Sequence, residues 1–177
     1  AEENTRESIF NAFRRKETFA TTGSRIAVRF FAGYDLFNID LNSESLVSEA
    51  YEKGVTMGSD IFNQDDKVPE FIVWAQRDKD GAPLQRVQII KGWIDFNSGR
   101  PFEKVFDIAC SDGLEPDSIT NRCPDNGAKV NINDCSISSN VGSSELKTVW
   151  RDPEFIPNDK IFYYVRVLEN PTCRWST

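Results

Sequence analysis

The sequence predicts an all-β protein, an Ig-like antiparallel β-sandwich with a short helix at its N-terminus. Residues 4–16 carry apolar side chains at helical spacing. From residue 70 onward, six segments rich in strand-forming residues are bounded by turn residues. The chain has 177 residues, of which 39% are hydrophobic, and this is enough for one ordinary domain with its own core.

The N-terminal segment is predicted to be an amphipathic helix. Asn4 is a suitable N-cap, and Glu7 follows three residues later, as in a capping box. Ile9, Phe10 and Phe13 share one face of this helix. One short helix cannot bury such a face by itself, so we expect the face to pack against the domain or against another part of a parent protein.

A second short helix is a candidate over 43–53, where Ser43 can cap the start and Gly54 can end it.

The last predicted strand is the clearest, because its odd-numbered residues from Ile161 to Val167 form one apolar and aromatic face. The predicted strands are 25–32, 71–76, 84–94, 104–109, 128–134, 145–150 and 161–169.

Charge and composition exclude several classes of function. The 21 basic and 28 acidic residues leave a net charge of -7, which disfavours binding to nucleic acid. No stretch approaches the ~20 apolar residues of a membrane-spanning helix, so we expect no membrane partner either. The sequence contains no histidine, which excludes a Ser-His-Asp triad, a Cys-His pair and a His-ligated zinc site.

The cysteines are an even set: Cys110, Cys123, Cys135 and Cys173. We expect disulfides rather than a zinc site, because the close C-x-x-C pairs typical of zinc ligands are missing. Three pairings are possible. Our working hypothesis joins Cys110 to Cys123, which closes one loop, and Cys135 to Cys173, which tethers the C-terminal tail. Disulfides imply an oxidising compartment, so we expect a periplasmic or secreted protein.

Acidic turns are the candidates for cation binding. Residues 78–81 match the first half of a calcium loop but lack its downstream glutamate, so we interpret them as a turn. The segment 111–127 contains Asp112-Gly113 and Asp125-Asn126-Gly127, for which a turn and a weak structural cation site are the two alternatives. A pair of carboxylates could also catalyse glycoside hydrolysis without histidine, although the sequence distinguishes no particular pair.

Aromatic residues are the candidates for contact with a ligand. Trp74, Trp93 and Trp150 lie in predicted strands, so we expect them to pack in the core. Trp175 lies in the C-terminal tail and is our candidate for a ligand contact.

Long, distinctive segments of the chain resemble a known family. They are RESIFNAFRRKETFATTGSRIAVRFF, AYEKGVTMGSDI, FIVWAQRDKDGAPLQRVQIIKGWID, ACSDG, RCPDNGA, SELKTVWRDPEF and FYYVRVLENPTCRWST. They resemble the C-terminal part of a bacterial family of unknown function, DUF 3604. The stretch from Ile9 to Ile26 also resembles the exit from the barrel of polymerase-and-histidinol-phosphatase (PHP) type proteins. There, such a helix leads through an alanine-threonine-glycine turn into a β-sandwich.

The resemblance implies that the chain is a truncated form of a longer protein. Full-length relatives resemble PHP-type metal-dependent hydrolases with histidine-rich metal motifs in an N-terminal barrel. None of those motifs matches here, so we assign no catalytic residue, metal ligand or cofactor to this chain. The resemblance implies that a divalent metal binds in the missing barrel. Residues 1–22 would be the helix and linker from that barrel, and 23–177 the β-sandwich. Members of the family resemble exported proteins.

The resemblance also implies a contact between the two domains. The helix face would pack against the barrel, and the following turn would lie near the junction. Glycine is required in that turn only if its backbone takes a positive φ. The candidates for interdomain contact are Ile9, Phe10, Phe13, Thr21, Thr22 and Gly23.

We therefore expect a non-catalytic accessory domain whose partner is its own N-terminal barrel. Its role would be to stabilise the barrel and shape the cleft, and the isolated chain would be inert. One alternative is a module that binds a carbohydrate or another cell-surface ligand. The other is a carboxylate-based hydrolase, with a bell-shaped pH profile that depends on a single Asp or Glu.

Overall fold

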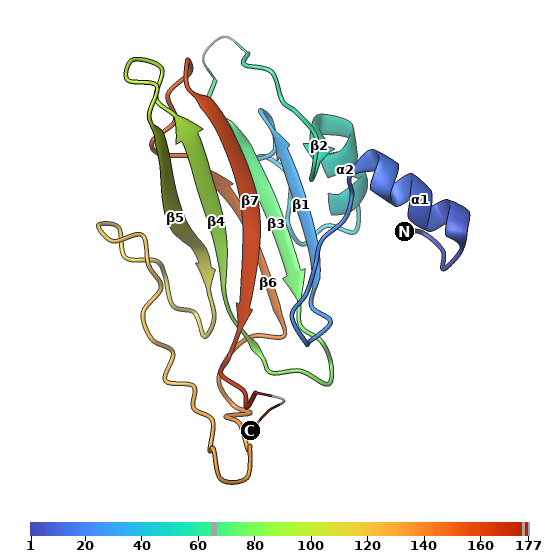
Figure 1. Cartoon of the computed structure of the whole chain (residues 1–177), viewed down its shortest axis with the longest axis vertical. Helices are drawn as coiled ribbons and strands as arrows, with labels where there is room; N and C mark the ends of the chain where they lie inside the picture. Colours follow the sequence, from blue (N-terminus) through green and yellow to red (C-terminus); the bar gives the residue numbers. More distant parts are fainter. Residues whose placement is uncertain (65–66, 175, 177) are drawn as a thin grey trace. The chain divides into compact units, whose positions relative to one another are not determined.

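Strands dominate the computed structural model, which describes residues 1–64, 67–174 and 176. Figure 1 labels two short helices and seven strands among these residues. In chain order they are α1 (Arg6–Arg15), β1 (Ala27–Gly33), α2 (Leu46–Lys53), β2 (Gly54–Thr56), β3 (Glu70–Gln76), β4 (Leu84–Ile94), β5 (Pro101–Cys110), β6 (Glu145–Arg151) and β7 (Lys160–Glu169).

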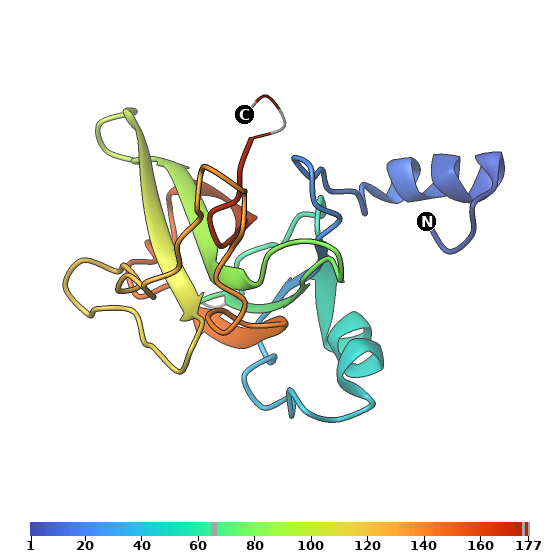
Figure 2. The same cartoon turned by 90° about the horizontal axis from the view of Figure 1, so that it is seen from below.

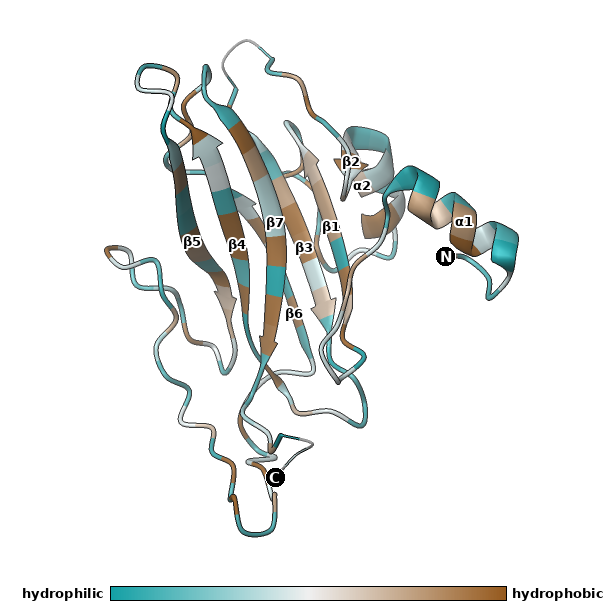
Figure 3. Cartoon of the chain, in the orientation of Figure 1, coloured by the Kyte–Doolittle hydropathy of each residue, from teal (hydrophilic) through white to brown (hydrophobic). Residues whose placement is uncertain are grey.

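The strands form two antiparallel sheets, one of four strands in the order β2-β1-β3-β6 and one of three in the order β5-β4-β7. Figure 1 shows β5, β4 and β7 side by side. This arrangement confirms the predicted all-β sandwich with two short helices. In Figure 3, hydrophobic residues run along β4 and β7, and hydrophilic bands separate them on β7. The shared face predicted for the last strand is confirmed, because its odd-numbered side chains from Ile161 to Val167 are less exposed than the even-numbered ones between them.

The chain divides into two compact units. The first comprises 1–20, 29–73 and 149–157, and the second comprises 21–28, 74–148 and 158–177. The predicted boundary between residues 22 and 23 stays a prediction.

Each unit has its own buried side chains. In the first unit the ring of Phe71 lies 5.7 Å from the ring centroids of both Phe30 and Trp150. In the second, Leu84, Val87, Ile89 and Ile90 of β4 are fully buried. A well-packed apolar core of this kind is the main stabilising contribution in each unit.

The helix α1 forms where its amphipathic sequence predicts, but its cap is different. Thr5 is the N-cap, and its hydroxyl accepts a hydrogen bond from the backbone N–H of Ser8 at 3.2 Å. The Ser8 hydroxyl in turn accepts from the backbone N–H groups of Glu2 and Glu3. The prediction of Asn4 as the cap is wrong, because Thr5 supplies the oxygen that the first turn needs.

Most other elements follow the sequence pattern, with two exceptions. The prediction of a strand over 128–134 is wrong, because this segment has only an isolated bridge between Val130 and Ile137. Asn131 and Asp134 instead accept hydrogen bonds from backbone N–H groups two residues on, which is a turn conformation. The short strand β2 was not predicted.

The second predicted helix exists as α2. It begins at Leu46, after the N-cap Ser45, rather than near Ser43, and it ends at Gly54 as expected. The side chains of Ser43 and Ser45 contact each other, and the backbone N–H of Ser45 donates to the Ser43 hydroxyl. Ser43 therefore belongs to the turn before the helix.

Candidate functional site

The helix α1 carries an apolar face that its own unit leaves open. Ile9, Phe10 and Phe13 are 40%, 58% and 64% exposed, whereas Ala12 is buried. We call these three residues the α1 face. They line a depression of about 910 Å³ together with the chain that leads into the helix. Figure 2 shows that α1 stands clear of α2, the other helix of its unit.

The predicted junction turn has the conformation that requires glycine. Thr21 and Thr22 are exposed, and Gly23 has φ +97°. A Cβ atom added to Gly23 would meet no heavy atom within 4 Å. Positive φ rather than lack of space is therefore the reason for glycine here. These three residues belong to the second unit and the α1 face belongs to the first.

Both disulfides of the working hypothesis are present. Cys110 pairs with Cys123 and Cys135 pairs with Cys173, with Cα–Cα distances of 5.7 and 5.6 Å. All four sulfurs are therefore engaged in bridges and do not form a zinc site. Two disulfides fit an extracellular or periplasmic protein.

The acidic turns use their carboxylates within the protein. Asp78 accepts hydrogen bonds from the backbone N–H groups of Arg25 and Asp80, and these bonds lower the pKa of its carboxyl. The hydroxyl of Ser111 donates to Asp112, which also accepts from the backbone N–H of Gly142, and the pKa of Asp112 is lowered as well. Both aspartates thus stay ionised as turn-stabilising acceptors.

Among the residues that the structure describes, no group of three or more His, Cys, Asp or Glu side chains could hold a metal ion.

One buried carboxylate in the second unit holds a charged cluster together. Asp107 accepts from Arg86 at 2.9 Å, from Arg122 at 3.3 Å, and from the amide of Gln88 and the backbone N–H of Cys123, both at 2.7 Å. Both oxygens of the carboxylate are thereby occupied. This arrangement is that of a structural anchor for the disulfide loop.

A second buried carboxylate has the same role in the first unit. Glu70 accepts from the backbone N–H groups of Leu36 and Phe37 at 2.7 and 2.8 Å, and it pairs with Arg151. It therefore anchors the loop after β1 rather than standing free as an acid or base.

Trp74, Trp93 and Trp150 contact other side chains, but they are half-buried and do not belong to the fully buried core predicted for them. The ammonium of Lys147 lies 4.3 Å from the ring centroid of Trp74. Trp93 and Trp150 each pack against a phenylalanine ring, at centroid distances of 5.5 and 5.7 Å. Trp175, the candidate for a ligand contact, lies outside the described residues.

A groove on one face of the three-stranded sheet is the candidate binding site. The strand register places Gly92 of β4 between Glu103 of β5 and Phe162 of β7. Directly opposed residues of antiparallel strands share a face, and so do residues two positions along. The side chains of this face that line the groove come from Ile94, Pro101, Glu103, Lys160 and Phe162.

This Gly92 groove has a volume of about 700 Å³, which is within the range of small-molecule sites. Gly92 contributes no side chain, and the ring of Phe162 leans into the space over it. A Cβ added at Gly92 would lie 2.3 Å from Cζ of Phe162. Glycine at this position is therefore required for the approach of the ring.

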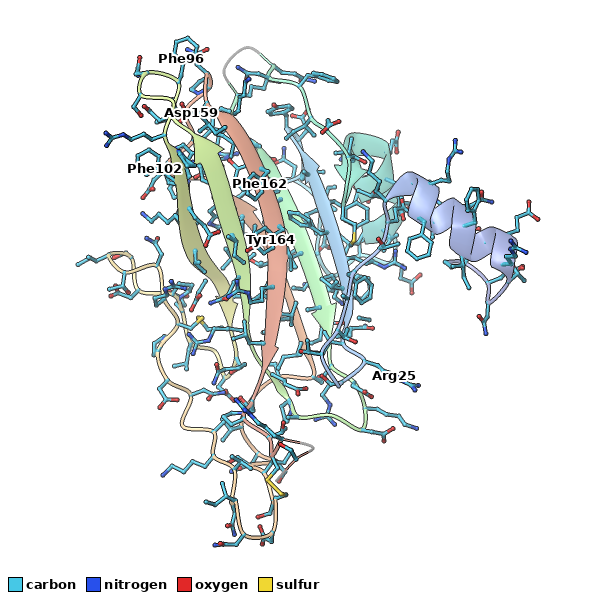
Figure 4. All side chains as sticks on the ribbon, in the orientation of Figure 1. Arg25, Phe96, Phe102, Asp159, Phe162 and Tyr164 are labelled. Carbon is cyan, nitrogen blue, oxygen red and sulfur yellow. A yellow bond between two sulfur atoms is a disulfide. The ribbon has the colours of Figure 1, made fainter. Side chains whose placement is uncertain are left out.

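Two aromatic rings project from β7 along the same face. Phe162 is 59% exposed and Tyr164 is 41% exposed. Their ring planes differ by 11°, and their centroids are 6.4 Å apart. In Figure 4 both labelled side chains extend from β7, and Phe102 extends from β5 on the other side of β4.

Opposite charges flank the groove. Glu103 and Lys160 are exposed, and within the described part of the chain neither forms an ion pair. At the end of the sheet, the backbone N–H of Phe96 donates to Asp159 at 2.9 Å and ties the β4–β5 turn to the start of β7. This bond lies close to Lys160 and helps to hold the end of the groove in place.

Sequence analysis did not single out the Gly92 groove. The available signal was on β7, where Phe162 and Tyr164 alternate with the predicted face of odd-numbered residues. Polar side chains are the usual expectation on an exposed face, so two neighbouring aromatic residues there mark a candidate binding surface. The role of Gly92 depends on its cross-strand neighbours, which the sequence alone does not specify.

No described helix has the length and apolar character needed to cross a membrane. Comparison with curated proteins and with solved structures finds no match. A family model described as "Protein of unknown function (DUF3604)" matches residues 1–177, and the chain therefore belongs to that family.

Proposed function

We propose that this chain is a non-catalytic C-terminal accessory β-sandwich domain of an exported bacterial protein. Its partner is the N-terminal barrel of the same protein, which resembles PHP-type metal-dependent hydrolases and holds the divalent metal. The exposed α1 face is the observation that carries this proposal. The accessory domain stabilises the barrel and shapes its cleft.

The length of α1 supports the proposal. The helix has 10 residues, and isolated helices shorter than about 12–15 residues are marginal in water. Burying a large apolar side chain contributes about 1.5–3 kcal/mol. A partner that covers Ile9, Phe10 and Phe13 would therefore supply the packing that this helix otherwise lacks.

Charges around the α1 face indicate the kind of surface that covers it. The guanidinium of Arg14 lies 6.0 Å from the ring centroid of Phe10, and Arg6 lines the same depression. Glu7 lines the depression as well, so a complementary surface would be apolar at its centre and would carry charges of both signs at its rim. We assign such a surface to the barrel.

The two disulfides support export, because such bridges persist in oxidising compartments. The proposal therefore places the protein in the periplasm or outside the cell.

The test is the double variant Phe10→Asp and Phe13→Asp in the parent protein that includes the barrel. We expect amide exchange in α1 to become at least about tenfold faster and the parent to melt at a lower temperature, because two carboxylates cannot be buried in an apolar contact. In the 177-residue chain the same substitutions should change stability by less than about 0.5 kcal/mol, since both side chains are exposed there.

Ile119→Asp is the matched control, because Ile119 is also a highly exposed apolar residue and lies far along the chain from α1. It should leave exchange in α1 unchanged in both proteins. Unchanged melting and unchanged α1 exchange in the double variant of the parent would contradict the accessory role.

A further inference from the structure

We propose that the Gly92 groove binds a pyranose unit of an uncharged polysaccharide. This inference goes beyond the accessory role and does not depend on it. It rests on two exposed and nearly parallel rings, a groove of about 700 Å³ beside one of them, and a pair of opposite charges at the rim of this groove.

The rings supply the apolar part of the site. Phe162 and Tyr164 have planes within 11° of each other and remain 59% and 41% exposed. The C–H groups on one side of a pyranose form a flat apolar surface that packs against aromatic rings. Two neighbouring, nearly parallel rings can contact successive sugar units of one chain.

The polar groups supply hydrogen bonds to the edges of the sugar. Glu103 carries only acceptors and Lys160 carries only donors, whereas a sugar hydroxyl both donates and accepts. The groove therefore offers a hydrogen-bond acceptor and a hydrogen-bond donor to the hydroxyl groups of the sugar. Because the two charges have opposite sign, the site favours neither an anionic nor a cationic ligand, and this points to an uncharged sugar.

The contact between Phe162 and Gly92 also stabilises the sheet, but that role alone does not explain the surface. One end of the Phe162 ring covers Gly92, while more than half of the residue remains exposed. Tyr164 lies opposite the fully buried Ile90, so it also covers the sheet. Both rings nevertheless remain 41% or more exposed, which leaves them accessible to a ligand.

Affinity electrophoresis of the 177-residue chain tests the proposal. Native gels would contain soluble β-glucan, xylan, galactomannan or amylose, and one gel would contain an acidic polyuronate. We expect at least one uncharged polysaccharide to retard the wild-type chain. Phe162→Ala and Tyr164→Ala should each weaken binding by about tenfold or more, and Glu103→Gln should weaken it by about threefold.

Two variants serve as matched controls. Phe96→Ala removes another exposed ring, which lies in the β4–β5 turn rather than beside Phe162 on β7, and it should retain binding. Tyr164→Phe keeps the ring and should retain most of the affinity. Near-ultraviolet circular dichroism of each variant shows whether it is folded. Glu103→Gln replaces an exposed side chain with one of the same shape, so we expect this variant to fold and to test binding even if the ring variants do not fold.

The outcomes are distinct. Retardation that depends on Phe162, Tyr164 and Glu103 supports the proposal. It is overturned if no uncharged polysaccharide retards the wild-type chain, if only the polyuronate does so, or if folded Phe162→Ala binds as well as the wild type. None of these outcomes bears on the α1 face, so the accessory role is judged separately.

Discussion

At the scale of single residues, the buried carboxylates show how polar groups organise this fold. Asp107 has a fully buried side chain, and Arg86, which pairs with it, is only 17% exposed in its side chain. A buried charge is tolerated only when partners replace the water it loses. Asp107 meets this condition with two guanidinium groups, one amide and one backbone N–H.

We therefore expect Asp107→Ala to be strongly destabilising. The substitution leaves the largely buried guanidinium of Arg86 without its carboxylate and leaves the N–H of Cys123 without its acceptor. The free energy of unfolding should fall by about 3–5 kcal/mol, measured by urea denaturation.

The matched control is Glu49→Ala, which breaks the ion pair between Glu49 and Lys53 at 3.6 Å on the surface. Exposed pairs at this helical spacing contribute only about 0.3–0.5 kcal/mol. If both substitutions had equally small effects, the anchoring role of Asp107 would be refuted.

At the scale of elements, α1 depends on its cap as much as on its sequence pattern. Thr5 and Ser8 together satisfy backbone N–H groups at the start of the helix. At the other end, Arg14 and Arg15 lie in the last turn, where positive charge is favourable, and Lys16 ends the helix in a left-handed conformation. Lys16 also packs against the backbone of Gly58, which joins the end of α1 to its unit.

Thr5→Ala should loosen α1 without affecting the strands. Loss of an N-cap oxygen costs about 1 kcal/mol, which corresponds to roughly fivefold faster amide exchange in the first turns of the helix. Thr5→Ser keeps the oxygen and should exchange at nearly the wild-type rate. Equal exchange in Thr5→Ala and the wild type would show that the cap does not limit opening of α1.

At the scale of the whole molecule, the disulfides restrict the unfolded chain. The bridges join residues 13 and 38 positions apart. In the loop-entropy account, the longer loop gives the larger stabilisation, by about 1 kcal/mol for this pair of lengths.

We expect the double variant Cys135→Ser and Cys173→Ser to lose about 1 kcal/mol more than Cys110→Ser and Cys123→Ser, measured by urea denaturation. Thiol titration of the unfolded wild type should find no free thiol, because all four cysteines are bridged. The opposite order of stability would show that native contacts around the Cys110–Cys123 bridge outweigh loop entropy.

Features that depend on near neighbours in the chain could be predicted from the sequence. The strand β4 has the predicted bounds, because turn-forming residues lie on both sides of a segment rich in Val, Ile and Trp. The end of α2 at Gly54 and the alternation along β7 are local patterns of the same kind. The cysteine pairing was a working hypothesis among the three that the sequence allowed, and the structure contains it.

Features that depend on residues far apart in the chain could be seen in the tertiary structure alone. The strand β2 is three residues long and exists because it pairs with Phe31, Ala32 and Gly33. The Gly92 groove exists because the register brings β5 and β7 to either side of β4. The local sequence pattern predicts which face of a strand a side chain occupies. The pairing between strands determines which side chains lie next to it. A binding surface consists of such neighbouring side chains, so it follows from the pairing.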